Sequence, residues 1–502
     1  TAMELDATNV NLVIRLANLL INSQSASEAE NALLQAISME NVNVSDLREI
    51  AAAAMRLGND SLALNALEKA VMITEKPSDD LQYDLARLYQ QKADYDKALA
   101  TIQSALSIND QNVAYYLLQA DLQEATQRPQ AALAALEHGL RLQESASAKT
   151  PVVASDLLDL HIRFARLLEK TGNLNSALYH AEKALAFNES SQEIQCIAVD
   201  LAERLLQREH AAQLIKNATE IGPTASHEEK IKHAEMVGFR AWQLLTKGDF
   251  DHAEAQLEQG LQFDGTNLRL MAGRIFLLTQ QGQTEEAQKL LDDRYSLLQD
   301  EIDQPDANLS SDILMLAEAA SEAFEWTAAL QMFTAYYDRH PGEPLAQLSY
   351  ARALVRAAEW QLVARELDVE NHLAQHDLIK SEVYVRFDQV IQDLKKAGFA
   401  GEGEHWRNRG EFIFQTASNR LVALDTHTIT EEDAPWTAVM FSKTGAIKNI
   451  YPLVDKYPSN PLLLGLAAWS IGDQDPNKAY AWAKKAVTMT PNHPILQAIL
   501  AT

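Results

Sequence analysis

A histidine pair is the first feature of this chain whose residue types and spacing could do chemistry. His372 and His376 stand four residues apart, which on a helix places both imidazoles on one face, as in zinc-binding helices. A zinc site needs a third ligand, and a metalloprotease needs glutamate directly after the first histidine, where this chain has Leu373. We therefore expect a solvated helix face here and no metal site.

Two further sequence features are weaker indications of a functional site. The glycine-rich run 398–403 lacks the preceding strand that a phosphate-binding loop requires, and Glu402 would repel phosphate. Cys196 is the single cysteine, which excludes an internal disulfide, and its neighbour Asp200 is acidic, which does not activate a thiol. We expect Cys196 to be a buried apolar residue, and we expect no catalytic residue, no cofactor and no metal.

The composition indicates a helical protein with a strong acidic excess. Hydrophobic residues make up 47% of the 502 residues, and there are only 18 glycines and 14 prolines to interrupt helices. The net charge of −27 opposes binding to nucleic acid or to an anionic membrane. The longest nearly uninterrupted apolar run, 461–471, is shorter than the roughly 20 residues of a membrane-spanning helix, so we expect no direct membrane insertion.

An internal repeat organises most of the chain. A helical pattern of small and apolar residues recurs, centred on Ala29, Ala63, Ala98, Ala132, Ala177, Ala211, Ala253, Ala287, Ala329 and Val363. The steps between these centres are 34, 35, 34, 45, 34, 42, 34, 42 and 34 residues. The longer steps predict loop insertions near 144–151, 222–233 and 300–311.

The repeat resembles the tetratricopeptide repeat (TPR) family. The repeat around Ala98 has the family's packing residues, and glycines stand at the turns of other repeats: Leu85, Ala86, Tyr89, Tyr95, Ala98, Ile102 and Ala105, then Gly58, Gly172 and Gly248. Trp326 and Trp360 take the position of the turn aromatic residue. Small residues are expected where the paired helices approach: Ala51, Ala86, Ala120, Ala165, Ala241, Ala317 and Ala351.

The resemblance implies an all-α fold, a right-handed superhelical solenoid of antiparallel helix pairs with about 12 repeats. We expect a TPR array over residues 1–370, degenerate or irregular helical repeats over 371–443, and C-terminal TPR units over 444–502. In this register the first and the last residues given are both expected to lie inside a repeat. Uncapped stacking surfaces at both ends would allow homo-oligomers.

The resemblance also implies a concave groove that binds peptides. Its lining positions fall on Tyr83, Arg87 and Gln90, then Leu117, Asp121 and Glu124, then Ile162, Arg166 and Glu169. Trp242 and Phe276 hold equivalent positions in adjacent repeats, with Leu245 and Thr279 beside them, and predict an aromatic anchor. Leu348, Arg352 and Val355 form a second candidate patch. An alternative interpretation places both aromatic rings in the core.

We therefore expect a non-enzymatic scaffold or adaptor for protein or peptide partners. The closing stretch 479–494 is loosely similar to long bacterial TPR proteins of envelope and exopolysaccharide machinery, so both a periplasmic and a cytoplasmic location stay open. Two alternatives remain: a regulatory or sensor arm of an enzyme whose catalytic domain lies outside these residues, and a self-stacking structural protein.

Overall fold

Every regular element of the described chain is a helix. The computed structural model describes residues 9–74, 78–147, 154–218, 225–305, 307–366, 381–416, 429, 431, 434–443, 445–491 and 493–501, and within these ranges there is no strand. The chain divides into two compact units, Thr1–Glu189 and Ser190–Thr502, which we call the N-terminal and the C-terminal unit. The predicted all-α fold of repeated helix pairs is confirmed.

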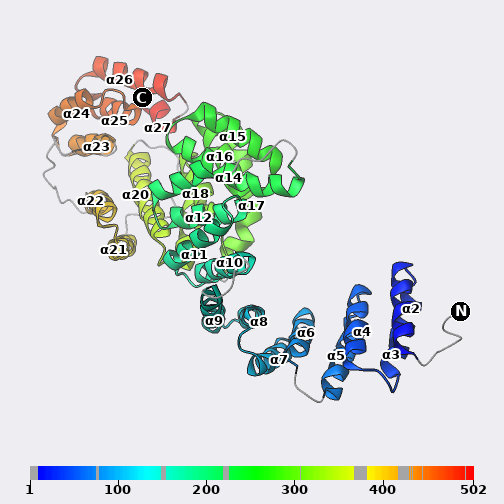
Figure 1. Ribbon diagram of the computed structural model, residues 1–502. Coiled ribbons are helices and arrows are strands. Elements are labelled where there is room, and N and C mark those ends of the chain that lie inside the picture. The colour runs from blue at the N-terminus through cyan, green and yellow to red at the C-terminus, as the bar shows by residue number, and fades with distance from the viewer. Residues whose placement is uncertain are drawn as a thin grey trace. The chain divides into compact units, whose positions relative to one another are not determined.

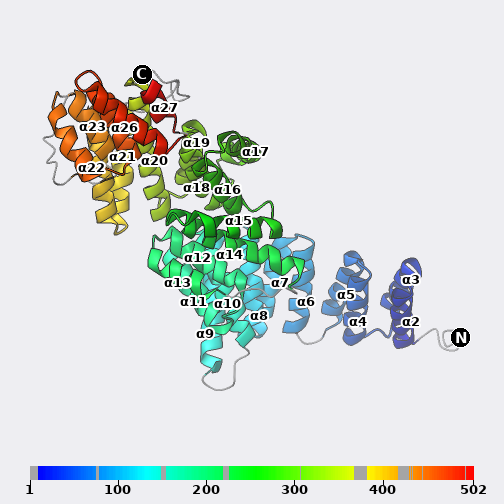
Figure 2. The ribbon, with the colours of Figure 1, turned by 90° about the horizontal axis from the view of Figure 1, so that it is seen from above.

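The N-terminal unit consists of five antiparallel helix pairs, α2–α3 to α10–α11, among its described residues (Figures 1 and 2). The helices are α2 (Val10–Asn22), α3 (Ala26–Ser38), α4 (Val44–Arg56), α5 (Asp60–Ile73), α6 (Asp79–Gln91), α7 (Tyr95–Ile108), α8 (Val113–Ala125), α9 (Pro129–Ser147), α10 (Ala154–Lys170) and α11 (Leu174–Phe187).

The C-terminal unit continues the pattern but mixes helix lengths. Its helices are α12 (Gln192–Arg204), α13 (Arg208–Asn217), α14 (His227–Thr246), α15 (Phe250–Phe263), α16 (Leu268–Gln280), α17 (Thr284–Asp303), α18 (Asp312–Glu322), α19 (Trp326–Arg339), α20 (Pro344–Glu366), α21 (Ser381–Lys396), α22 (Ala400–Thr416), α23 (Ala434–Lys443), η2 (Ile447–Asn449), α24 (Ile450–Lys456), α25 (Pro461–Ile471), α26 (Pro476–Met489) and α27 (Pro494–Ala501).

A left-handed residue marks the turn inside each of the first nine helix pairs. The backbone φ angle is positive at Gln24, Gly58, Ala93, Gln127, Gly172, Leu206, Gly248, Gly282 and Phe324. In each case the next residue donates its N–H to a carbonyl five residues back, as Asn59 does to Ala54 at 2.9 Å, which satisfies a free carbonyl at the helix end. These turns follow one another at 34, 35, 34, 45, 34, 42, 34 and 42 residues, so the predicted repeat spacing is confirmed up to α19.

Two of these turns offer a matched test of backbone strain. Gly58 has φ +76° with nothing within 4 Å of an added Cβ, and Ala93 has φ 58° at the equivalent position. We expect Gly58→Ala to lower the free energy of unfolding by about 1 kcal/mol, because a side chain disfavours the left-handed region. Ala93→Gly should raise the free energy of unfolding. Urea unfolding followed by circular dichroism measures both, and shifts of the same sign would contradict this explanation.

Small residues sit where the helices meet. All seven alanines predicted at the close approaches, from Ala51 to Ala351, are at most 3% exposed. The alanines of the second helices, from Ala29 to Ala329, are buried to the same degree. The predicted packing positions are thus confirmed.

The prediction of a tenth repeat, centred on Val363, is wrong. The structure has one continuous helix, α20, across the place where a turn was expected before Val363. Trp360 therefore lies within a helix rather than at a turn. It is buried, and its ring centroid is 4.8 Å from that of Phe324. No glycine or proline interrupts residues 345–366, so the helix continues where tertiary partners hold both of its halves.

Downstream of α20 the helices pair again. α21 and α22 lie side by side (Figures 1 and 2), joined by a turn in which Gly398 has φ 102°. The glycine-rich run is thus the turn and first residues of α22. Parts of the predicted insertions are helical, because α9 reaches Ser147, α14 begins at His227 and α17 continues to Asp303. The domain boundaries at 370 and 443 stay predictions.

Candidate functional site

The groove positions predicted on α6 lie together in the N-terminal unit. Tyr83 and Gln90 are half-buried, and Arg87 is exposed. The Arg87 guanidinium lies 5.9 Å from the Tyr83 ring centroid, and that ring is 5.1 Å from Tyr115. These side chains form a polar and aromatic surface of the kind the register predicts, and their role in binding stays a prediction.

A second set of predicted positions lines a cavity between α8 and α10. Asp121, Glu124, Ile162 and Arg166 all border this space of about 270 Å³. Arg166 is exposed, and the neighbouring Arg163 forms ion pairs with Asp121 and Asp159. The repeat register therefore brings these residues of two successive repeats together.

The predicted aromatic anchor is a contacting pair. The rings of Trp242 on α14 and Phe276 on α16 are 5.8 Å apart and meet edge to face at 66°. Both are half-buried and pack on the hydrophobic core, while Leu245 is 3% exposed. The Thr279 hydroxyl donates to the Ile275 carbonyl at 2.9 Å. The pair is shared between the core and the surface.

The helices α12, α16, α18 and α20 of the C-terminal unit enclose a buried ion network that the sequence did not reveal. Arg269 on α16 is 2% exposed and pairs with Glu203 of α12 and Asp312 of α18, each at 2.7 Å. Arg204 of α12 pairs with Glu343, next to α20, at 3.1 Å. First helices of non-adjacent repeats are thereby joined.

The network holds more acid than base. Asp200, Glu203, Glu235, Asp312 and Glu343 surround Arg204 and Arg269. Burial, together with the charges of Asp312 and Asp200, raises the pKa of Glu235 to about 7. Burial likewise raises the pKa of Glu203, although Arg269 opposes this. We assign the network to holding the helices together.

The second predicted patch leads to the strongest candidate site. Leu348 and Val355 are buried, but Arg352 lines a cavity of about 460 Å³ in the C-terminal unit. We call this cavity the arginine–aromatic pocket. Its lining comes from α18, α20, α22, α23 and the residues at the start of α25 and α27: Ser321, Glu322, Phe324, Arg352, Arg356, Glu359, Trp360, Arg409, Pro435, Trp436, Asn460, Leu462, His493 and Ile495.

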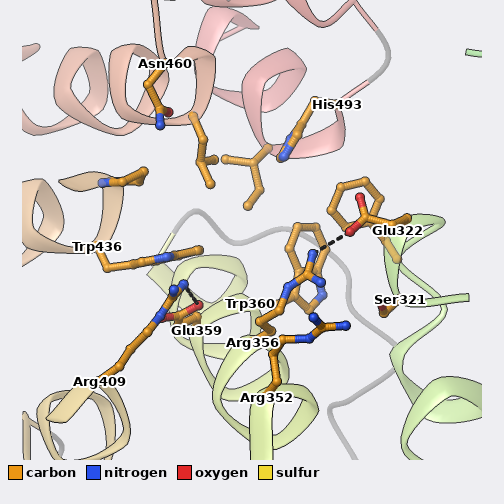
Figure 3. Close-up of a pocket in the computed structure, with 14 residues that line it drawn as sticks. Ser321, Glu322, Arg352, Arg356, Glu359, Trp360, Arg409, Trp436, Asn460 and His493 are labelled. Atoms are coloured by element: carbon orange, nitrogen blue, oxygen red, sulfur yellow. Dashed lines mark hydrogen bonds and ion pairs between the residues drawn. The ribbon is translucent and has the colours of Figure 1, made fainter. Parts of the chain in front are cut away.

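The walls of the arginine–aromatic pocket differ in character. Figure 3 shows Arg352, Arg356 and Trp360 projecting from α20, with Asn460 and His493 on the opposite wall. Phe324 lies 4.8 Å from Trp360 and 5.0 Å from His493 by ring centroids. Burial lowers the pKa of His493 to about 4, so that this imidazole is neutral at pH 7. The wall around it is therefore aromatic and uncharged.

Ion pairs orient the arginines of the pocket. Glu318 accepts from Arg352 at 2.5 Å and from Arg356 at 3.1 Å, and Arg356 also donates to Glu322 at 2.6 Å. Burial would raise the pKa of Glu318, but the two guanidinium groups hold it below its usual value. Arg352 is 35% exposed, so it can donate to a ligand while Glu318 keeps it in place.

The third arginine of the pocket, Arg409, links two helices. Arg409 of α22 donates from Nε and Nη2 to both carboxylate oxygens of Glu359, at 2.6 and 2.8 Å. Both side chains are almost fully buried. This two-point bond joins α22 to α20 and shapes the pocket wall beside Trp436 (Figure 3).

Part of this pocket was visible in the sequence. Glu318 and Arg352 are separated by 34 residues, and so are Glu322 and Arg356, which is the step of the repeat. Opposite charges one repeat apart could have identified both pairs. Arg409 and Trp436 could not be found in this way, because their elements follow no 34-residue register.

No feature of the described residues indicates a metal or membrane site. Within the ranges that the structure describes, no three histidine, cysteine, aspartate or glutamate side chains are grouped to hold a metal. His372 and His376 lie outside the described residues. Cys196 is buried, as expected, and burial raises the pKa of its thiol. None of the described helices combines the length and apolar character that a membrane-spanning segment requires.

Helix pairs that recur at a fixed step, each closed by the same left-handed turn, define a helical repeat protein. Residues 79–112, which contain α6 and α7, match the family model of the tetratricopeptide repeat. A similar helix pair recurs along the described chain, which is therefore a helical repeat protein that contains a tetratricopeptide repeat at residues 79–112. Proteins of this fold are typically non-enzymatic scaffolds for protein–protein interaction.

Comparison with known proteins shows that other helical repeat structures are similar to parts of this chain. The search of curated proteins found no match to this chain. The C-terminal part of a TPR repeat-containing protein from Cytophaga hutchinsonii is 13% identical, with a TM-score of 0.42, over 52% of this chain and 98% of that one. A tetratricopeptide repeat protein from Parabacteroides merdae is 15% identical, with a TM-score of 0.33, over 53% and 96%. YrrB, described as a TPR protein with an unusual peptide-binding site, is 16% identical, with a TM-score of 0.33, over 42% and 99%.

Proposed function

We propose that this chain is a non-enzymatic scaffold that binds peptide segments of partner proteins, and that the arginine–aromatic pocket is one of its binding sites. The observation that carries the proposal is the position of Arg352. The Arg352 side chain is partly exposed, is oriented by Glu318, and lines a cavity of about 460 Å³ whose walls include tryptophan and phenylalanine.

The chemistry of the pocket suits a peptide. Trp360, Trp436 and Phe324 offer apolar surface to one side chain of a ligand, and tryptophan and arginine are enriched among residues that dominate binding energy. Arg352 can donate to a backbone carbonyl or a carboxylate of the same ligand. Glu318 and Glu322 balance the charge of Arg352 and Arg356, so a ligand carboxylate binds there through its hydrogen bond from Arg352 and not through a net positive charge.

The first test uses an array of short random peptides probed with the full chain. We expect peptides that combine an apolar side chain with a carboxylate to bind, and Arg352→Ala to weaken them about tenfold, because a hydrogen bond to a charged group contributes roughly 1.5–3 kcal/mol. Arg274→Ala is the matched control, since it removes a similar arginine, paired with Glu254 on the same unit, outside the pocket.

Two results would count against this pocket. One is the absence of any peptide that discriminates Arg352→Ala from Arg274→Ala. The other is equal binding by Trp436→Ala, a second variant that changes the opposite wall without altering the arginines.

The half-buried pair Trp242 and Phe276 is a second proposed contact, on the helices α14 and α16. We expect Trp242→Ala combined with Phe276→Ala to weaken binding of a partner peptide while the helix content stays unchanged. Because both rings also pack on the core, unfolding must be measured beside binding. A loss of helicity in circular dichroism would assign the rings to the core instead.

A further inference from the structure

The C-terminal end of this acidic chain has the opposite charge. Residues 445–502 contain five lysines, three aspartates and neither arginine nor glutamate, whereas residues 1–444 contain 38 basic and 67 acidic residues. Three of the lysines, Lys478, Lys484 and Lys485, belong to α26, which has no acidic residue. A basic helix in such a chain needs a physical explanation.

Aromatic side chains accompany this charge. The Lys478 ammonium lies 4.5 Å from the ring centroid of Tyr451 and 5.2 Å from that of Trp482. The two rings are 5.8 Å apart and inclined at 55°. Lys478 and Trp482 are one helical turn apart on α26, and Tyr451 comes from α24. Lys485, seven residues after Lys478, lies on the same side of α26, and its ammonium donates to the Pro458 carbonyl at 2.7 Å. We call Tyr451, Lys478, Trp482 and the exposed Lys485 the lysine–aromatic face.

The lysines of this face are not neutralised within the described chain. Lys97 and Arg409 also lie over aromatic rings, but each pairs with a carboxylate, Asp94 and Glu359 respectively. Among the residues that the structure describes, no carboxylate pairs with Lys478 or Lys485. Asp475, the nearest acid in sequence to Lys478, accepts from its backbone N–H and caps α26.

We propose that the lysine–aromatic face binds an acidic polypeptide segment. A glutamate or aspartate of the segment pairs with Lys478 or Lys485, and an adjacent apolar side chain packs on Trp482 and Tyr451. This surface is separate from the arginine–aromatic pocket, although the proposal shares with the proposed function the premise that the ligand is a polypeptide.

Charge and size favour a polypeptide over other anionic partners. Membrane recognition by charge uses clusters of about four to eight basic residues, more than this face presents. Nucleic acid would bring many phosphates close to a body whose remaining 444 residues are strongly acidic. A single acidic segment needs only the two lysines and the rings.

The test uses a fluorescent peptide of alternating glutamate and leucine, its glutamine counterpart, and the full chain. We expect the glutamate peptide to bind in an anisotropy titration and Lys478→Glu to weaken it at least about fivefold, since reversing a charge turns attraction into repulsion. Lys247→Glu, at an exposed lysine after α14, is the control for the change in net charge and should leave binding unchanged.

Four results would overturn the proposal. They are equal binding of the glutamine peptide, equal effects of the two lysine variants, a larger loss in Arg352→Ala than in Lys478→Glu, and preferential binding to phosphatidylglycerol vesicles. The third would move the site to the arginine–aromatic pocket and support the proposed function alone. Loss in Lys478→Glu with full binding in Arg352→Ala supports this face whether or not the pocket binds peptides.

Discussion

Replacing Arg269 by alanine is expected to lower the free energy of unfolding of the C-terminal unit by about 3–5 kcal/mol. Removing one partner of a buried ion pair leaves the other charge without compensation. Arg269 is 2% exposed and contacts carboxylates from two helices, Glu203 of α12 and Asp312 of α18. Its guanidinium also lies 3.8 Å from the ring centroid of Phe239, so packing is lost as well.

The measurement is simple because all seven tryptophans lie after residue 190. Urea unfolding of the full chain followed by tryptophan fluorescence therefore reports the C-terminal unit. Arg274→Ala, which breaks the partly exposed pair with Glu254, should cost less than about 1 kcal/mol. Equal effects of the two substitutions would show that the buried network does not stabilise the fold.

The loss in Arg269→Ala should grow with pH. Burial already raises the pKa of Glu203 and Glu235, the latter to about 7, and removing the nearest cation raises them further. The folded state then holds protons that the unfolded state releases near its ordinary value of 4.5, so stability falls as pH rises through that interval. We expect a larger difference between variant and parent at pH 8 than at pH 5.

Replacing Glu359 by leucine is expected to have the second largest effect, about 3–5 kcal/mol, because it leaves the buried guanidinium of Arg409 without its two-point bond. The double variant Glu359→Leu with Arg409→Leu removes both charges and should recover most of that stability. The same tryptophan-detected unfolding measures the complete cycle. A double variant as unstable as the sum of the single ones would contradict this explanation.

Glu359→Leu and Arg352→Ala distinguish two kinds of arginine around the arginine–aromatic pocket. Arg409 is nearly buried and doubly bonded to one carboxylate, so its loss changes folding. Arg352 is 35% exposed, and Glu318 retains Arg356 when Arg352 is removed, so its loss should change binding more than folding. This difference makes Arg352 the informative position for a peptide assay.

Sequence reasoning succeeded where contacts are local or one repeat apart. Gly58, Gly172 and Gly248 indicated turns that the backbone angles confirm, and the buried alanines from Ala29 to Ala329 follow the predicted step. Helix formation depends on neighbours three and four residues away, and a repeat packs mainly on the next one. The ion pair of Arg352 with Glu318, 34 residues earlier, also follows this step.

The same register failed at α20. A step of 34 residues from Ala329 predicted a turn before Val363, but Glu359 and Trp360 have partners in other elements, Arg409 and Phe324, and the helix continues. Helix propensity alone allowed either a turn before Val363 or a continuous helix. Contacts distant in sequence decided it.

The amino-acid sequence by itself therefore determined the helix pairs, their turns and the acidic character of this protein, because these depend on local spacing and composition. Only the tertiary structure decided which non-adjacent repeats meet. Arg204 and Glu343, 139 residues apart, pair because the packing of the intervening helices brings α12 into contact with α20. Contacts of this kind have no local signature, which is why the buried ion network and the Arg409 and Trp436 walls of the arginine–aromatic pocket were found only in the fold.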